Sequence, residues 1–171
     1  MVRNIILLLS FITFSVFTQS FSNLSHIGSK SMGTAGAVVS DINDLETVFY
    51  NPAGLVNIKP YSFIAGTTDL YGLKFLNHQF LSVSLPYSSA ISIQQLGTNS
   101  SGFSDKNLST EKSITFSKAF FLLDDANSKL SIGYNINGLI FYQNASAGVN
   151  GDGVGGLSSG ETSVLGLDIG V

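Results

Sequence analysis

The sequence predicts an all-β fold, an antiparallel transmembrane β-barrel of the outer-membrane type. This chain is expected to contribute about six strands and a short N-terminal plug segment containing a short helix. Only 11% of the 171 residues are charged, whereas an ordinary soluble domain has about 25%. Apolar and polar residues alternate after the N-terminus, where no apolar run reaches the ~20 residues of a membrane-spanning helix. Alternating lipid-facing and lumen-facing residues explain both observations. A soluble β-sandwich with few charges remains the alternative.

Residues 1–22 have the organisation of a secretory signal peptide. Arg3 supplies the positive charge, Ile5 to Phe17 forms the apolar core, and Ser20-Phe21-Ser22 or Thr18-Gln19-Ser20 supplies a cleavage site. The apolar run is too short for an anchor helix of ~20 residues, and the absence of cysteine excludes a lipoprotein anchor. We therefore expect an exported protein, with residues 23–60 as the plug segment and residues 61–171 as an incomplete barrel.

Glycines and a proline turn define the predicted plug segment. Gly28, Gly33 and Gly36 allow close backbone approach or a positive φ, which predicts a compact stretch without a regular strand or long helix. Pro52 disfavours the helical region for the residue before it, so Asn51 is expected to be extended. The turn is then completed by Ala53-Gly54.

Residues 41–50 predict a short helix within the plug segment. Apolar residues recur there at spacings of three and four, as Ile42, Leu45, Val48 and Phe49. Asp41 is the predicted N-cap, and Asp44 and Glu46 are expected near the positive end of the helix dipole.

These residues resemble the N-terminal signature of FadL-like outer-membrane proteins, and are most similar to the PorV/PorQ type. The matching positions are Gly28, Gly33, Gly36, Ala37, Asp44, Asn51, Pro52, Ala53, Gly54 and Leu55. Members of this family usually carry alanine-rich sequence where this chain has Leu45-Glu46-Thr47. The resemblance implies that this plug or hatch motif occludes the barrel lumen in the outer membrane.

Six segments of alternating polarity predict the strands, namely residues 61–68, 78–85, 89–96, 112–122, 129–143 and 164–171. Pro86-Tyr87-Ser88 and residues 124–127 predict tight turns, and residues 97–109 and 144–163 predict loops. In the second strand Leu81 and Val83 alternate with Ser82 and Ser84. One face of the sheet is therefore expected to be apolar and the other polar.

Two positions interrupt this pattern. Lys118 lies on an otherwise apolar face, where a lysine costs ~2 to 4 kcal/mol at the bilayer midplane and much less near an interface. It is therefore expected near a membrane boundary or in protein contact. Gly138 is expected to form a bulge at which the alternation changes face. The strand that contains it, residues 129–143, is longer than a crossing of ~9 to 11 residues and is expected to project beyond the bilayer.

The number of strands predicts a piece of a larger barrel. About six strands cannot close even the smallest bacterial barrel, which has about 8. An open sheet in lipid would leave unpaired backbone groups at its edges. The chain is therefore expected to be the N-terminal part of a longer protein.

The sequence predicts no enzyme, no cofactor and no metal site. His78, Ser82 and Ser84 share one strand face, but residues i and i+4 of a strand lie ~13 Å apart, too far for a catalytic pair. Gly28 to Thr34 lacks the lysine of a phosphate loop, and Asn150 to Gly153 offers too few calcium ligands. The net charge of −3 provides no basic patch for nucleic acid.

The resemblance implies two alternative functions. PorV-like relatives are accessory barrels in type IX protein secretion, and bind translocon proteins and substrates. FadL-like relatives passively transport long-chain fatty acids or other hydrophobic compounds across the outer membrane. The residues also leave open whether the plug segment is a movable hatch or a cap that only stabilises the barrel. In each case the expected partners include outer-membrane lipid.

Overall fold

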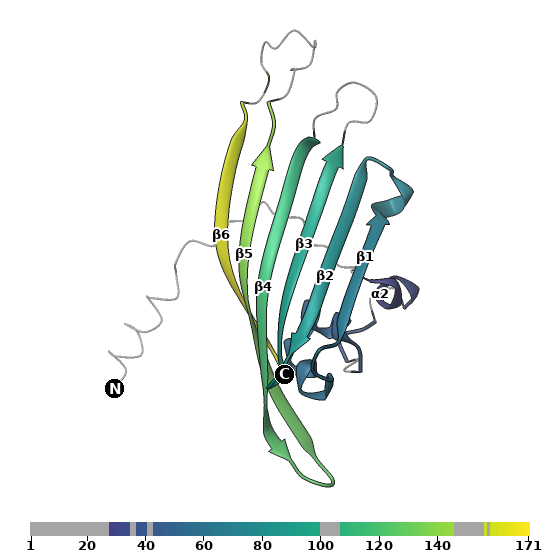
Figure 1. Ribbon diagram of the computed structural model, residues 1–171, viewed down its shortest axis with the longest axis vertical. Coiled ribbons are helices and arrows are strands. Elements are labelled where there is room, and N and C mark those ends of the chain that lie inside the picture. The colour runs from purple at the N-terminus through teal and green to yellow at the C-terminus, as the bar shows by residue number, and fades with distance from the viewer. Residues whose placement is uncertain (1–27, 35–36, 41–42, 100–106, 146–155, 157) are drawn as a thin grey trace, which may run out of the picture.

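A single antiparallel sheet dominates the computed structural model, which describes residues 28–34, 37–40, 43–99, 107–145, 156 and 158–171. Its six strands lie side by side in sequence order (Figure 1). They are β1 (Phe63–Asp69), β2 (Leu76–Leu85), β3 (Ser89–Asn99), β4 (Asn107–Asp124), β5 (Lys129–Gln143) and β6 (Gly160–Gly170). The helices are α2 (Ser29–Gly33), η1 (Leu45–Phe49), η2 (Pro52–Asn57) and η3 (Leu70–Gly72). The all-β prediction is confirmed as an open sheet with β1 and β6 at its edges.

The predicted strand positions hold, with differences at the strand ends. β5 has the predicted limits, while β3, β4 and β6 extend into stretches that were predicted as loops. The extension of β3 and β4 includes the pair Thr98 and Ser109, whose hydroxyl groups are hydrogen-bonded at 3.1 Å. Polar side chains that suggested a loop are therefore compatible with a continued strand, because they bond to each other across it.

The two short connections are tight turns, as predicted. Tyr87 and Ser88 both have positive φ, at 63° and 53°, and this conformation lets the chain reverse direction between β2 and β3. Between β4 and β5, Asp125 donates to the Ser128 carbonyl at 2.9 Å. This second hairpin extends beyond the neighbouring strands (Figure 1), because the pairing of β3 with β4 ends at Ser89 and Lys118.

The predicted bulge at Gly138 is wrong. Gly138 pairs in register with Ile114 on one side and with Leu165 on the other. Irregular pairing is found instead between Phe121 and Leu123, in the projecting hairpin. Beyond it, Leu123 is opposite Leu130 and Asp124 is opposite Lys129.

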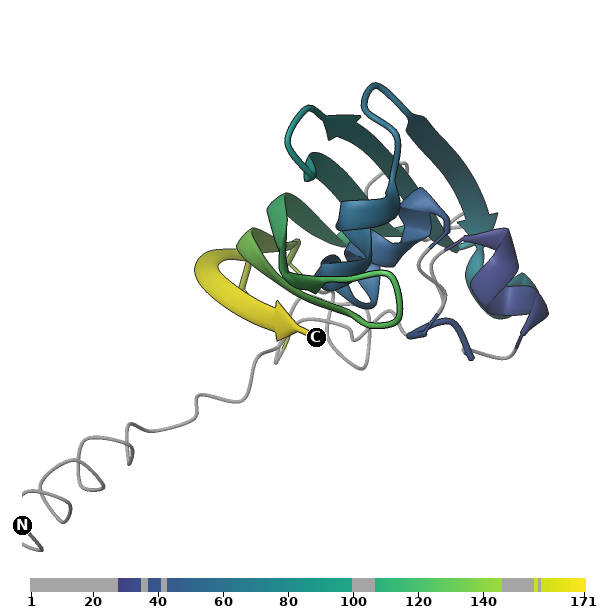
Figure 2. The same cartoon turned by 90° about the horizontal axis from the view of Figure 1, so that it is seen from below.

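Helices η1 and η2 lie on the concave side of the sheet, which we call the inner face (Figure 2). Cross-strand pairing groups small and polar residues on this face. One row across the sheet contains Ile64, Ser82, Ser92, Thr115, Asn137 and Gly166. The hydroxyl groups of Ser82 and Ser92 are hydrogen-bonded at 2.8 Å, and Thr115 donates to Asn137 at 2.7 Å. The inner face therefore satisfies much of its own polarity.

The opposite side, the outer face, is apolar and exposed. One of its rows contains Phe63, Val83, Ile91, Phe116, Ile136 and Leu167. The neighbouring row contains Ala65, Leu81, Ile93, Ile114, Gly138 and Leu165. Exposed fractions reach 77% for Phe63 and 78% for Leu165. Nothing among the described residues covers this apolar surface.

The plug segment is helical, but differs in detail from the prediction. Its helices η1 and η2 are 3-10 helices, and the N-cap of η1 is Asp44, whose side chain accepts from the Glu46 amide at 3.1 Å. The predicted N-cap, Asp41, lies outside the described residues. The helix begins at Leu45, directly after Asp44. η1 stops before Asn51, because Asn51 is extended ahead of Pro52, as predicted. None of the described helices is long and apolar enough to cross a membrane.

Candidate functional site: the contact between the plug segment and the inner face

Helix η2 packs on Gly133 of β5 and Gly170 of β6, which we call the seat of η2. A Cβ atom on Gly133 of β5 would lie 2.5 Å from the backbone nitrogen of Ala53, and one on Gly170 of β6 would lie 2.9 Å from Cδ of Pro52. Real Cβ atoms do not approach other atoms so closely, so any side chain at either position would displace the helix. A glycine inside a strand commonly marks such a close backbone approach. The plug segment therefore rests directly on the backbone of the sheet.

Asn51 fastens the start of η2. Its Oδ1 accepts from the Ala53 amide at 3.2 Å, which is the N-cap interaction. Its Nδ2 donates to two carbonyl groups, that of Val39 at 3.3 Å and that of Val171 at 3.0 Å. The side chain, which is 9% exposed, thus joins η2 to an earlier part of the plug segment and to the residue after β6.

A small apolar core lies between the plug segment and the sheet. Leu45, Val48 and Leu55 of the plug segment pack with Ala90 and Ala119 of the inner face. Asn135 of β5 adds a hydrogen bond from its Nδ2 to the Val48 carbonyl at 3.0 Å. Because the side chains of the inner face are short, the larger side chains of the helices fill the space between the layers.

Glu46 of η1 packs against Gly28, within the plug segment. Gly28 has a φ of +89°, and a Cβ atom there would lie 2.5 Å from Oε2 of Glu46. Glu46 is 5% exposed, and in the described part of the chain its Oε2 has no hydrogen-bond partner. Burial, and secondly the negative charge of Asp44, raise the pKa of Glu46, while backbone hydrogen bonds from Ser31 and Lys30 partly oppose this rise.

The structure brings most of the predicted motif residues to this contact. Asn51, Pro52 and Ala53 lie against β5, β6 or the residue after β6, Gly28 and Asp44 make contacts to Glu46 within the plug segment, and Gly54 is buried within η2. Gly33 is different, because it is exposed and a Cβ atom there would meet no atom within 4 Å. Gly36 lies outside the described residues. Whether these residues act as a hatch remains a prediction.

Three residues of the contact and one buried residue of the plug segment were not identified from the sequence. They are Glu46 as a buried group, Asn135, Gly133 and Gly170. The two glycines carried a usable signal, since both interrupt strands at positions of inner-face parity. No sequence signal indicated the role of Asn135, because the carbonyl group that it binds lies 87 residues away in the sequence.

The geometry offers no hydrolytic site around His78. Ser82 is bonded to Ser92, and Ser84 donates to the Lys59 carbonyl at 2.7 Å. His78 is fully buried, and its ring stacks on Phe80 at 5.8 Å between centroids. In the described part of the chain, no three His, Asp or Glu side chains are grouped as metal ligands would be.

The seat of η2 predicts a specific effect of Gly133→Ala. The added methyl group should displace η2 and lower the free energy of unfolding by about 1–3 kcal/mol, the usual cost of overpacking. Trypsin cleavage after Lys30 should become faster as the plug segment loosens. The control is Gly166→Ala in β6, which is also on the inner face. There the new Cβ atom would lie at an ordinary contact distance of 3.6 Å from Cβ of Asn137. Equal stability of the two variants would contradict the proposed seat.

Glu46 predicts a pH dependence of stability. Because its pKa is higher in the folded than in the unfolded protein, its contribution to stability is fully present below the unfolded value of 4.5 and is lost as the pH rises through the folded value. Glu46→Gln should abolish this component and make the folded protein more stable at neutral pH. Denaturant unfolding at several pH values measures it, with the exposed Glu161→Gln as control. An unchanged pH profile for Glu46→Gln would exclude this role.

Comparison of the chain with models of protein families, with curated proteins and with solved structures finds no match. Function is therefore inferred from the sheet, its two faces and the contact with the plug segment.

Proposed function

We propose that this chain forms part of an outer-membrane β-barrel, with the outer face against lipid and the plug segment across the lumen. The observation that carries the proposal is the distribution of polarity over the two faces. In a soluble β-sandwich the apolar face of a sheet is covered by another layer. Here the helices cover the polar face, and the apolar rows remain exposed. Lipid is the environment in which this arrangement is favourable.

The lengths of the connections give the proposed barrel an orientation. Tight turns join β2 to β3 and β4 to β5 at one end of the sheet, whereas β1 to β2, β3 to β4 and β5 to β6 are joined by longer stretches at the other. Outer-membrane barrels have short periplasmic turns and longer extracellular loops. We therefore assign the end with the tight turns to the periplasm. Closure of the barrel requires that the edges β1 and β6 pair with further strands.

The turn between β2 and β3 has the hydrogen bonding expected at a membrane boundary. All three of its carbonyl groups have protein donors. Ser89 Oγ donates to the Pro86 carbonyl at 2.7 Å, the Ala119 amide donates to the Ser88 carbonyl at 2.9 Å, and Lys118 Nζ donates to the Tyr87 carbonyl. In water, the carbonyl groups of a turn can accept hydrogen bonds from solvent. Near lipid they need donors from the protein.

Lys118 shows how the apolar face accommodates a charge. Besides its bond to the turn, its ammonium group lies 5.9 Å from the ring centre of Tyr87 and 5.4 Å from that of Phe120. The predicted protein contact of Lys118 is thereby confirmed. Tyr61 and Tyr87 are 75% and 87% exposed at this end of the sheet, and exposed aromatic residues are typical of the interface belts of barrels.

Within the membrane, the proposed role is that of an accessory barrel of the PorV/PorQ type in type IX protein secretion. It is supported by the anchoring of the plug segment, since η2 is fixed by Gly133, Gly170 and Asn51 and η1 by the bond from Asn135. A fixed plug suits a protein that binds secretion partners through its outer surface and loops. FadL-like uptake of hydrophobic compounds is the alternative, and requires that the plug segment move.

The lipid contact predicts that Phe116→Arg impairs membrane assembly. Phe116 is 40% exposed within an apolar row, and an arginine there should cost about 2–4 kcal/mol in lipid. Urea unfolding of the full-length protein in phospholipid vesicles measures this cost, together with recovery of the protein in outer-membrane fractions. Ala126→Arg, in the turn after β4, is the control. An arginine tolerated equally at both positions would refute a lipid-facing sheet.

Locking the plug segment should distinguish the two roles. The chain has no cysteine, so Val48→Cys combined with Asn135→Cys introduces a single pair at a place where plug and wall are hydrogen-bonded. Cross-linking this pair should leave protein secretion unchanged if the barrel is an accessory protein. It should abolish uptake of a labelled fatty acid if the plug is a hatch. Each single-cysteine variant, treated in the same way, is the control.

A further inference from the structure

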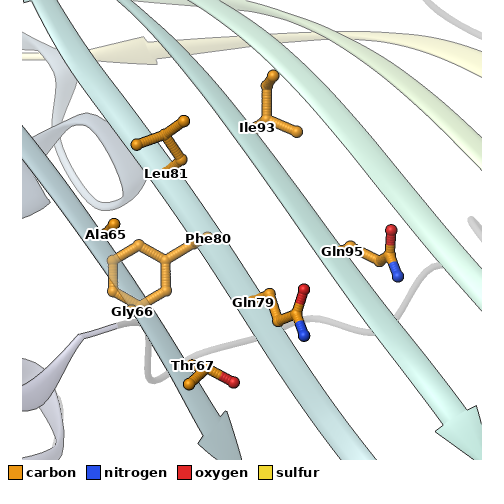
Figure 3. Close-up of a pocket in the computed structure, with 8 residues that line it drawn as sticks. All are labelled: Ala65, Gly66, Thr67, Gln79, Phe80, Leu81, Ile93 and Gln95. Atoms are coloured by element: carbon orange, nitrogen blue, oxygen red, sulfur yellow. The ribbon is translucent and has the colours of Figure 1, made fainter.

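A shallow pocket interrupts the outer face over β1, β2 and β3, with a volume of about 530 Å³ (Figure 3). Beneath the pocket, on the inner face, the Phe80 ring packs against Gly66, where an added Cβ atom would lie 2.6 Å from Cε1 of Phe80. The Phe80 ring is held in place by Phe49, edge to face at 5.7 Å, and by His78. The part of the sheet beneath the pocket is therefore packed against the plug segment on its inner face.

The two ends of the pocket differ in chemistry. Leu81 and Ile93, paired across β2 and β3, form the apolar end with Ala65 (Figure 3). Gln79 and Gln95, also paired, form the polar end. Ile93 is 48% exposed and Leu81 is 43% exposed. The pocket therefore spans the limit of the apolar rows, on the side of the long connections.

The polar end has hydrogen-bonding capacity that the protein does not use. Gln79 donates through Nε2 to Asn77 at 3.0 Å, which leaves its Oε1 as an acceptor. Among the described residues the Gln95 amide has no hydrogen-bond partner. Lys112 pairs with Gln95 across β3 and β4, is exposed, and forms no ion pair with the part of the chain that the structure describes. This end therefore offers an acceptor, a complete amide and a positive charge.

We propose that this pocket binds a phosphorylated glycolipid of the outer leaflet, a lipid of the lipid A type. One acyl chain lies over Leu81 and Ile93, the sugar hydroxyl groups meet the amides of Gln79 and Gln95, and a phosphate meets Lys112. The inference rests on the proposed function, which places the long connections outside the cell. Lys112 can donate a charge-assisted hydrogen bond to a phosphate, and the two amides can exchange hydrogen bonds with hydroxyl groups. A head group with both a phosphate and a sugar therefore suits this end of the pocket better than one that has a phosphate without a sugar.

Native mass spectrometry of the full-length protein in detergent tests the site, with diphosphoryl lipid A as probe. Gln95→Leu combined with Lys112→Met should lower the affinity about tenfold, equivalent to the loss of about 1.4 kcal/mol. Ile93→Trp should lower it as well, by filling the apolar end. Lys129→Met removes an equal charge at the opposite end of the sheet, where Lys129 pairs with Asp124 at 3.3 Å. That control should bind lipid A as the unmodified protein does.

Either of two results would overturn the proposal. One is equal affinity for lipid A in the double variant, in Ile93→Trp and in the control. The other is equally tight binding of phosphatidylglycerol, which carries a phosphate but no sugar. The outcome is separate from that of the proposed function, because recovery in outer-membrane fractions is measured independently. A protein that assembles in the outer membrane but ignores these substitutions would contradict only the lipid site.

Discussion

The close approach of η2 to the backbone of β5 and β6 is the contact on which the arrangement of plug and sheet depends. Gly133 and Gly170 leave no space for a Cβ atom beneath Pro52 and Ala53. This approach brings the Asn51 side chain within reach of the Val171 carbonyl. It also places the larger apolar side chains of the plug segment over short side chains of the sheet. A bulkier residue at either glycine would therefore disturb the hydrogen bonds as well as the packing.

The polarity of the sheet follows from the same requirement. Where the inner face accepts η1 and η2 closely it carries mainly small side chains, and serine, threonine and asparagine meet this need while bonding to each other. Most of the large apolar residues of the strands lie on the outer face, where Phe63, Ile114 and Leu165 are more than half exposed, whereas Phe80 packs on the inner face against Phe49. In water this distribution would be unfavourable. In a bilayer it provides both the lipid-facing surface and the closed lumen that we propose.

Two polar features on the outer face are explained by the same environment. Lys118 serves the carbonyl group of a turn and two aromatic rings near the proposed periplasmic boundary. Gln79, Gln95 and Lys112 lie at the opposite limit of the apolar rows, where their polar groups remain available. The charge near the turns is used within the protein, whereas the polar groups near the long connections can bind a partner. This difference is the basis of the proposed lipid site.

Local rules were sufficient for much of the fold. Alternation of polarity placed the strands and their faces, with β5 at its observed limits, and the restriction that Pro52 imposes made Asn51 extended. Local patterns also suggested a bulge at Gly138 that does not exist. They assigned the N-cap to Asp41, although Asp44 performs this role at the observed helix. Both errors arose because a glycine or an aspartate has several local uses, and its neighbours in sequence do not select among them.

The sequence by itself determined the class of the fold, the strands, the tight turns and the separation of polar from apolar faces, because these depend on residues close together in the chain. Only the tertiary structure decided what each special residue contacts. Asn51 binds a carbonyl 120 residues away, and the glycines beneath η2 are significant only once the plug segment folds onto them. The Phe80 ring likewise packs beneath Gly66 of the neighbouring strand and against Phe49 of the plug segment. Such contacts arise when distant segments pack together, so no local pattern of residues specifies them.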